Sequence, residues 1–108
     1  MFESFDRSRS RYASLGVVSS LPGELIDSIW LIIDLNLKGV IPLTNMLAFD
    51  VFNNNGRVTL RFSQEFSDVE MAVDLAYAYS TSFPERVFAF DDGTRETILL
   101  PTEISEHS

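Results

Sequence analysis

The sequence contains no cysteine, and this absence removes several kinds of chemistry at once. Without thiols the chain forms no disulfide, binds no metal through thiolates and has no cysteine nucleophile. Its one histidine, His107, is the penultimate residue, where we expect a solvated side chain rather than a catalytic one. No apolar run approaches the roughly 20 residues that cross a bilayer. We therefore expect no metal, no cofactor and no membrane span.

The sequence signatures of common catalytic sites are missing as well. There is no glycine-rich phosphate loop, no GxSxG and no HExxH. The opening residues MFESFDRSRSRY lack the apolar centre of a secretion signal. These absences predict a cytoplasmic protein that is not an enzyme.

What the chain does contain is enough apolar material for one core. It has 108 residues, of which 45% are hydrophobic, and nine are phenylalanine. A chain of this length is expected to form a single domain. We predict a flexible N-terminal arm over residues 1–10, one domain over residues 11–101 and a C-terminal tail over residues 102–108.

Charge is distributed unevenly along the chain. The net charge is −8, and residues 1–61 carry equal numbers of acids and bases. Residues 62–108 contain ten acids but only two bases, Arg86 and Arg95. Such a surface repels nucleic acid and attracts basic proteins. We therefore predict a protein partner with a basic surface and no direct contact with nucleic acid.

Two segments have the pattern of helices. Residues 24–39 place Ile26, Ile29 and Ile33 on one stripe and end at a glycine, which favours a long amphipathic helix. Residues 67–80 begin with Ser67 followed by Glu70, the spacing of a capping box, and predict a second helix.

The other segments favour strands. Residues 11–21 are expected to form an irregular strand in which Gly16 marks a bulge or a close backbone approach. Residues 46–66 alternate apolar and polar positions on both sides of NNNG, and residues 86–101 do so around DDGT, so each predicts a hairpin. The predicted fold is α+β, with an antiparallel sheet of about five strands against the long helix and a shorter second helix.

The neighbouring carboxylates Asp91 and Asp92 raise the question of a metal or catalytic pair. Aspartate favours turn entry, and the following glycine accepts a positive φ. A calcium loop would need further oxygen ligands at set spacing, and none follows. This favours a hairpin turn over a metal site.

Several segments together resemble a known family. RYASLGV, SIWLIID, FDVF, FSQE and FDDGTRETILLPTE, spread over about residues 11–104, are similar to the family catalogued as domain of unknown function 960. Its members are small proteins of Gram-positive bacteria, their phages and mobile elements. The resemblance implies a cytoplasmic bacterial or phage setting and an accessory role on mobile DNA, and it carries no catalytic residue to this chain.

These observations favour a non-enzymatic, acidic protein-binding accessory factor. In its most specific form this factor inhibits a host defence nuclease, of the anti-CRISPR or anti-restriction type, by mimicking nucleic acid. The carboxylates expected to contact the basic partner are Glu70, Asp74, Asp91, Asp92 and Glu96.

Two other functions remain open at this point. The first is a small-ligand sensor or sequestering protein, as a monomer or a homodimer, with a pocket lined by Trp30, Tyr77 and Tyr79. In that reading the aromatic side chains would contact the ligand rather than only fill the core. The second is a structural subunit of a larger complex.

Overall fold

A six-stranded, mostly antiparallel sheet in the order β1-β6-β5-β2-β3-β4 is the centre of the fold. A computed structural model describes residues 4–6 and 8–106 of the chain. The strands are β1 (Ser10–Ala13), β2 (Met46–Asn54), β3 (Arg57–Ser63), β4 (Met71–Ala78), β5 (Arg86–Asp91) and β6 (Arg95–Leu99). The helices are α1 (Leu15–Ser20), α2 (Gly23–Ile32), the π-helical turn η1 (Ile33–Leu37) and the 3-10 helix η2 (Pro101–Glu106). The predicted α+β class is confirmed.

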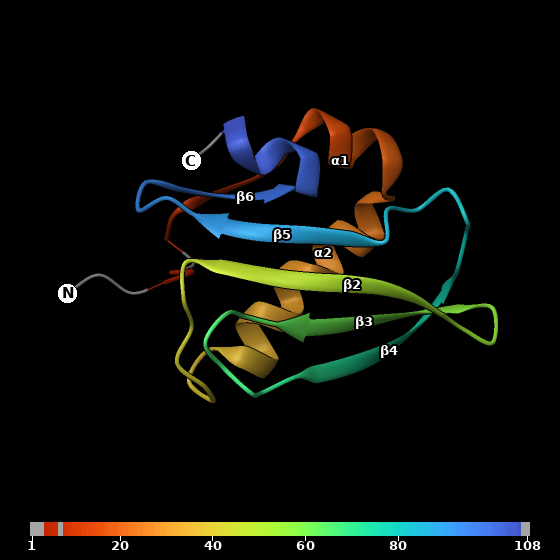
Figure 1. Cartoon of the computed structure of the whole chain (residues 1–108), viewed down its shortest axis with the longest axis horizontal. Helices are drawn as coiled ribbons and strands as arrows, with labels where there is room; N and C mark the ends of the chain where they lie inside the picture. The colour runs from red at the N-terminus through yellow and green to blue at the C-terminus, as the bar shows by residue number, and fades with distance from the viewer. Residues whose placement is uncertain (1–3, 7, 107–108) are drawn as a thin grey trace.

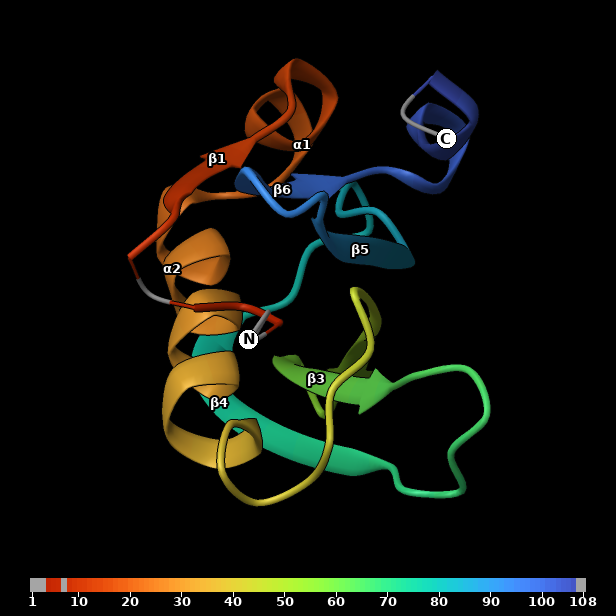
Figure 2. The same cartoon turned by 90° about the vertical axis from the view of Figure 1, so that its left-hand side faces the viewer.

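Helix α2, continued by η1, covers one face of the sheet (Figures 1 and 2). Its buried residues Leu25, Ile29 and Ile33 pack on inward side chains of the central strands. Phe49 and Phe62 meet in this layer with ring centroids 5.9 Å apart. The predicted helix over residues 24–39 is confirmed, and Gly39 follows its end with a φ of 80°. We call the other side of the sheet, which α2 does not cover, the open face.

Both predicted hairpins are present. β2 and β3 pair antiparallel around Asn55 and Gly56, which have positive φ angles of 53° and 90°. β5 and β6 pair in the same way across Asp92 and Gly93. Asn55 and Gly56 in the first turn, and Gly93 with a φ of 93° in the second, supply the left-handed conformations that such tight turns require.

The helix predicted over residues 67–80 is wrong. This segment contains β4, an edge strand paired with β3, and its burial alternates residue by residue. Ser67 caps no helix, because its hydroxyl accepts a hydrogen bond from the N–H of Val69 in a local turn. Pairing with β3 satisfies the backbone groups along one edge and turns Val73 and Leu75 toward the core. This tertiary pairing overrides a local helical signal.

The strand predicted over residues 11–21 is half correct. β1 ends at Ala13. Ser14 then caps the short helix α1, because its side chain accepts a hydrogen bond from the N–H of Val17. The close approach predicted at Gly16 is confirmed. An added Cβ there would lie 2.8 Å from a methyl group of Leu100 and 2.9 Å from a carboxylate oxygen of Glu103.

The described parts of both termini pack against the domain, contrary to the predicted arm and tail. Phe5 is fully buried in the main core. Residues 101–106 form η2, and Glu103 accepts hydrogen bonds from Ser14 and from the backbone N–H of Leu100. The core therefore extends beyond the predicted limits of residues 11–101. The expectation for His107 falls outside the described residues.

Within the described part of the chain, every helix is too short or too polar to cross a lipid bilayer.

Candidate binding groove on the open face

The five carboxylates predicted to meet a basic partner do not form one surface. Asp91 and Glu96 point to the helix side of the sheet and are 1% and 0% exposed. They pair directly across the β5–β6 hairpin. Because both side chains are inside the domain, neither can contact a partner, and the prediction that they present charge is corrected.

The other three carboxylates are exposed but lie on different parts of the molecule. Asp92 closes the β5–β6 turn by accepting hydrogen bonds from the N–H groups of Thr94 and Arg95. Glu70 precedes β4, and Asp74 lies within it. Three strands separate β6 from β4, which places these two groups of acids about 19 Å apart by the usual strand spacing.

Asp91 and Glu96 belong to an internal charge network that holds the N-terminal segment. Asp91 Oδ2 accepts hydrogen bonds from the backbone N–H of Phe5 at 2.7 Å and from Arg9 Nη1 at 3.1 Å. Arg11 Nε donates to Glu96 Oε1 at 2.8 Å, and its two terminal nitrogens donate to Asp34. This arrangement agrees with the predicted hairpin turn, because Asp91 accepts its hydrogen bonds from groups of the protein itself.

Glu96 is the exception in this network. Among the described residues its Oε2 atom has no hydrogen-bond partner, and Arg9 Nη1 is 3.9 Å away. Burial raises the pKa of the Glu96 carboxyl, although the hydrogen bond from Arg11 acts in the opposite direction. Because the Glu96 side chain is fully buried, a partner cannot contact this oxygen. We therefore assign the network a structural role.

The aromatic residues predicted to line one ligand pocket are separated. Trp30 on α2 lies beneath Arg11, whose guanidinium carbon is 4.8 Å from the ring centroid. Tyr77 and Tyr79 instead gather around Phe83, at centroid distances of 6.5 Å and 5.9 Å. All three pack against the core, so the prediction of a shared pocket is corrected.

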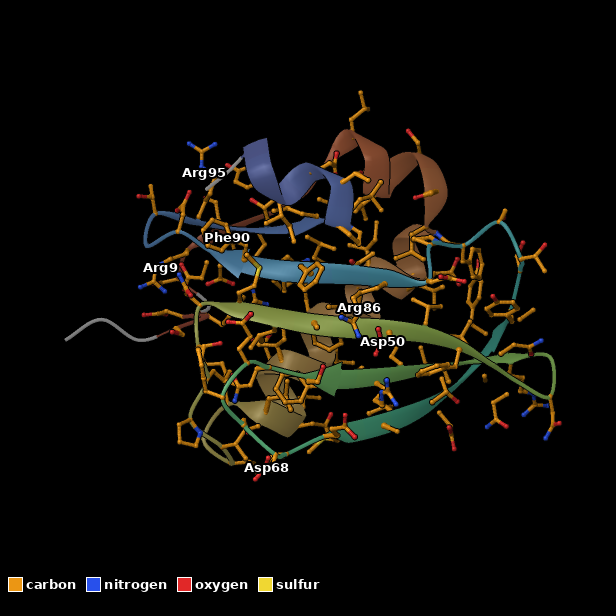
Figure 3. All side chains as sticks on the ribbon, in the orientation of Figure 1. Arg9, Asp50, Asp68, Arg86, Phe90 and Arg95 are labelled. Carbon is orange, nitrogen blue, oxygen red and sulfur yellow. The ribbon has the colours of Figure 1, made fainter. Side chains whose placement is uncertain are left out.

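The open face carries a charged cluster that the sequence analysis did not identify. Asp50 on the central strand β2 lies directly opposite Arg61 of β3 on one side and Arg86 of β5 on the other. Arg86 donates two hydrogen bonds to Asp50, and Arg61 donates one at 2.9 Å. The guanidinium groups cover the carboxylate: the Asp50 side chain is only 8% exposed, whereas those of Arg86 and Arg61 are 46% and 40% exposed. Figure 3 shows Asp50 next to Arg86.

The electrostatics of the cluster favour the charged forms of Asp50 and Arg86. Burial opposes ionisation of Asp50, but the hydrogen bonds from Arg86 and then Arg61 outweigh it and lower the pKa of the carboxyl. The hydrogen bond to Asp50 raises the pKa of Arg86. Arg61 Nε is buried and has no hydrogen-bond partner among the described residues. The Asp50 carboxylate thus holds two guanidinium groups, and each of them has N–H donors that Asp50 does not use.

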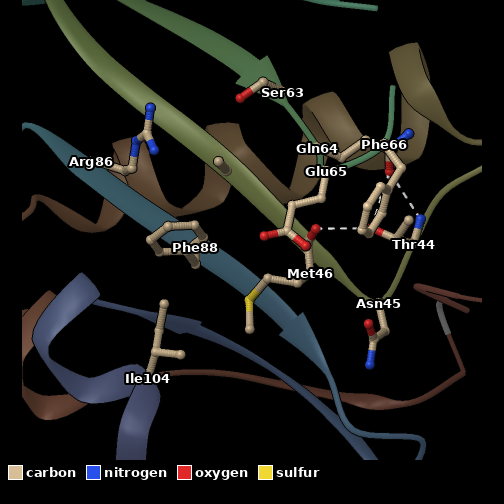
Figure 4. A pocket seen from close by; sticks show the side chains of 11 residues that line it. Thr44, Asn45, Met46, Ser63, Gln64, Glu65, Phe66, Arg86, Phe88 and Ile104 are labelled. Atoms are coloured by element: carbon tan, nitrogen blue, oxygen red, sulfur yellow. Dashed lines mark hydrogen bonds between the residues drawn. The ribbon is translucent and has the colours of Figure 1, made fainter. Parts of the chain in front are cut away.

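Two hollows adjoin this cluster and share Arg86, and together we call them the groove. The larger has a volume of about 700 Å³ and lies between the β3–β4 connection and η2 (Figure 4). Its apolar lining consists of Met46, Ala48, Phe66, Phe88 and Ile104. The smaller, of about 550 Å³, is lined by residues that include Asp50, Phe52, Arg61 and Tyr79.

Aromatic rings accompany both arginines. The Arg61 guanidinium carbon lies 4.8 Å from the centroid of Phe52, and that of Arg86 lies 5.9 Å from the centroid of Phe88. These distances are within the range of cation–π attraction. The rings and the shared carboxylate hold both guanidinium groups in place, so the groove is organised before any partner arrives.

The fold and the sequence together place the chain among known proteins. The family model described as staphylococcal protein of unknown function, DUF960, matches residues 10–103. The chain belongs to the DUF960 family. A crystal structure of a protein of unknown function from Enterococcus faecalis superposes with a TM-score of 0.93 and 75% sequence identity, over 95% of this chain and 97% of that one. None of the curated proteins matches.

The DUF960 match covers every strand and helix of the domain except part of η2, so the groove apart from Ile104 lies within the matched residues. Across residues 4–6 and 8–106, histidine, aspartate and glutamate side chains form no group of three that could hold a metal ion. For contact with a ligand the groove offers guanidinium groups, aromatic rings, apolar side chains and the carboxylates of Glu65 and Glu85.

Proposed function

We propose that this protein is a binding module whose groove receives a segment of another protein. That segment places apolar side chains in the larger hollow and a carboxylate against Arg86 and Arg61. The observation that carries the proposal is the composition of the open face, where two anchored arginines lie among Phe52, Phe66, Phe88 and Met46. The core of a protein–protein interface is enriched in aromatic residues, methionine and arginine.

The two hollows support a protein segment over a compact ligand. They lie on both sides of Arg86 and together extend from Phe66, in the β3–β4 connection, to Tyr79, just beyond the end of β4. An extended segment can follow such a surface. The proposal needs no reacting group, in agreement with the expectation of a non-enzymatic role. Mimicry of nucleic acid stays a prediction, now without Asp91 and Glu96 as contact residues.

A titration with a defined peptide tests the proposal. The probe is an acetylated, amidated peptide of alternating phenylalanine and glutamate, and its control carries glutamine in place of glutamate. Amide NMR spectra of the protein should shift at Met46, Arg86 and Phe88 with the first peptide, and more weakly with the second. No shift in the groove at millimolar peptide would contradict the proposal.

A matched variant identifies the charges responsible. Asp50→Asn/Arg86→Gln removes one acid and one base together, and Arg61, whose side chain is 40% exposed, then loses its carboxylate partner. It should weaken peptide binding by about tenfold or more, and thermal unfolding shows whether it is folded. Asp92→Asn, in the β5–β6 turn, should bind the peptide like the wild type. Equal binding by all three proteins would place the peptide outside the groove.

A second candidate is a small apolar carboxylate in the larger hollow. The volume of about 700 Å³ is typical of small-molecule sites, and the lining combines five apolar residues with Arg86 at one side. The same NMR measurement with sodium decanoate tests it. Shifts confined to this hollow, with none from the peptide, would favour the small ligand over the protein segment.

A further inference from the structure

Phe66 has two properties that rarely occur together. Its side chain is 101% exposed, and its backbone has a φ of 62°. A bulky residue in the left-handed region is strained by about 1–3 kcal/mol. Phe5 has the same φ but is fully buried, so its core contacts offset the strain. In the described chain no burial compensates Phe66.

Hydrogen bonds fix the chain just before Phe66. Gln64, two residues earlier, accepts a hydrogen bond from the N–H of Thr44 at 2.9 Å and donates one to the carbonyl of Pro42 at 2.8 Å. From there the β3–β4 connection extends past the open face, on the side away from α2 (Figure 2). Glu65 and Phe66 therefore stand together at the border of the larger hollow (Figure 4).

These two neighbours have the chemistry that the groove selects. Glu65 offers a carboxylate, and Phe66 offers an exposed aromatic ring. The same face carries the matching receptors, namely Arg86 and the apolar hollow beside Phe88. If one surface carries both a pair of groups and the groups that bind them, a two-fold axis between two copies forms each contact twice.

We infer that a second copy of this chain occupies the groove, with Phe66 of each copy in the larger hollow of the other and Glu65 beside the other copy's Arg86. The inference rests on the proposed function, because it names the partner of the same groove. Burial of both Phe66 rings supplies the contacts that are missing in the single chain. The net charge of −8 on each copy opposes association in general, so the contact depends on this local pairing of opposite charges.

Sedimentation equilibrium over about 1 μM to about 1 mM protein tests the inference. We expect a monomer–dimer equilibrium for the wild type. Phe66→Ala should raise its dissociation constant about thirtyfold or more, the size of a hot-spot loss. Val69→Ala, at an exposed apolar position in the same connection, should change the constant less than about threefold. A wild type that remains monomeric throughout, or a dimer that Phe66→Ala leaves intact, would overturn the inference.

Cross-linking supplies a second measurement that does not remove Phe66. The chain has no cysteine, so one preparation can carry Glu65→Cys and another Ile104→Cys. Each chain then has a single thiol, and a disulfide between the two variants can form only between copies. Oxidation of the mixture should give this product, whereas a mixture of Glu65→Cys with Val18→Cys on α1 should not. Equal products from both mixtures would contradict the proposed contact.

The peptide titration is carried out at a protein concentration at which the chain is monomeric, so the two proposals can fail separately. Peptide binding without self-association overturns the inference and leaves the proposed function standing. Self-association that requires Phe66, without peptide binding, supports the inference and shows that the groove binds a second copy of this chain rather than the peptide. The absence of both overturns both.

Discussion

The backbone N–H of Phe5 donates a 2.7 Å hydrogen bond to the carboxylate of Asp91, joining residues that are 86 positions apart in the chain. Arg9 approaches the same oxygen, and the other oxygen accepts from the N–H of Gly93. Asp91 therefore has two structural roles. It shapes the β5–β6 turn, and it holds the N-terminal segment so that the Phe5 ring fills the core.

Asp91→Asn and Asp92→Asn should have very different effects on stability, although the residues are neighbours. Asp91→Asn removes the charge of a fully buried acceptor that holds both Arg9 and the backbone of Phe5, and we expect a loss of about 3 kcal/mol or more. Asp92 is exposed, and asparagine can make the same turn hydrogen bonds, so its loss should be below about 0.5 kcal/mol. Urea unfolding of both variants measures the difference. Equal losses would contradict the network.

Phe5→Ala and Phe66→Ala form a matched pair, because the two residues have the same backbone φ and opposite exposure. Removing a fully buried phenylalanine should cost about 3–5 kcal/mol of unfolding free energy. Removing an exposed one should change it by less than about 0.5 kcal/mol. Both are measured by urea unfolding at a concentration where the chain is monomeric. A small effect of Phe5→Ala would show that the N-terminal segment contributes little to the core.

Glu96 makes stability depend on pH with a sign opposite to that of an acid whose folded-state pKa is lowered. Because burial raises its folded-state pKa above the unfolded value of about 4.3, the folded protein holds this proton more tightly. The contribution of Glu96 to stability should therefore fall as the pH rises from about 4.3 through the folded pKa. Arg9, Arg11 and Asp91 all face this group.

Comparison with Glu96→Gln isolates that contribution. The unfolding free energy of the wild type, minus that of the variant, should decrease between about pH 4 and about pH 7. The Asp50 carboxyl titrates in the opposite sense, since its lowered pKa makes its contribution disappear as the pH falls below about 3.9. It is present in both proteins and cancels. A difference that stays constant with pH would contradict the burial argument.

Ala76→Thr distinguishes the observed strand from the helix that residues 67–80 suggest. Ala76 is exposed on β4, where threonine should raise the unfolding free energy by up to about 1 kcal/mol. In a helix the same change would lower it by about half that amount. Leu31→Thr on the exposed side of α2 is the control and should be destabilising. Destabilisation by Ala76→Thr, measured by urea unfolding, would contradict the strand.

Some of the groove was within reach of sequence reasoning. Once the Asn55-Gly56 turn sets the hairpin register, Asp50 must lie opposite Arg61 on the open face. The alternation of β2 and β3, combined with this register, is sufficient to predict the charged pair across them. Arg86 was out of reach, because its place beside Asp50 depends on the pairing of β2 with β5, more than thirty positions away.

The sequence by itself determined α2 and the two hairpins, because helical periodicity and turn chemistry act between residues close together in the chain. Only the tertiary structure decided that residues 71–78 form a strand, that Asp91 and Glu96 lie inside, and that Asp50 gathers two arginines. Each of these outcomes depends on which strands become neighbours. Backbone pairing and burial between distant segments set that arrangement, and they outweigh the smaller helix or strand propensity of any one segment.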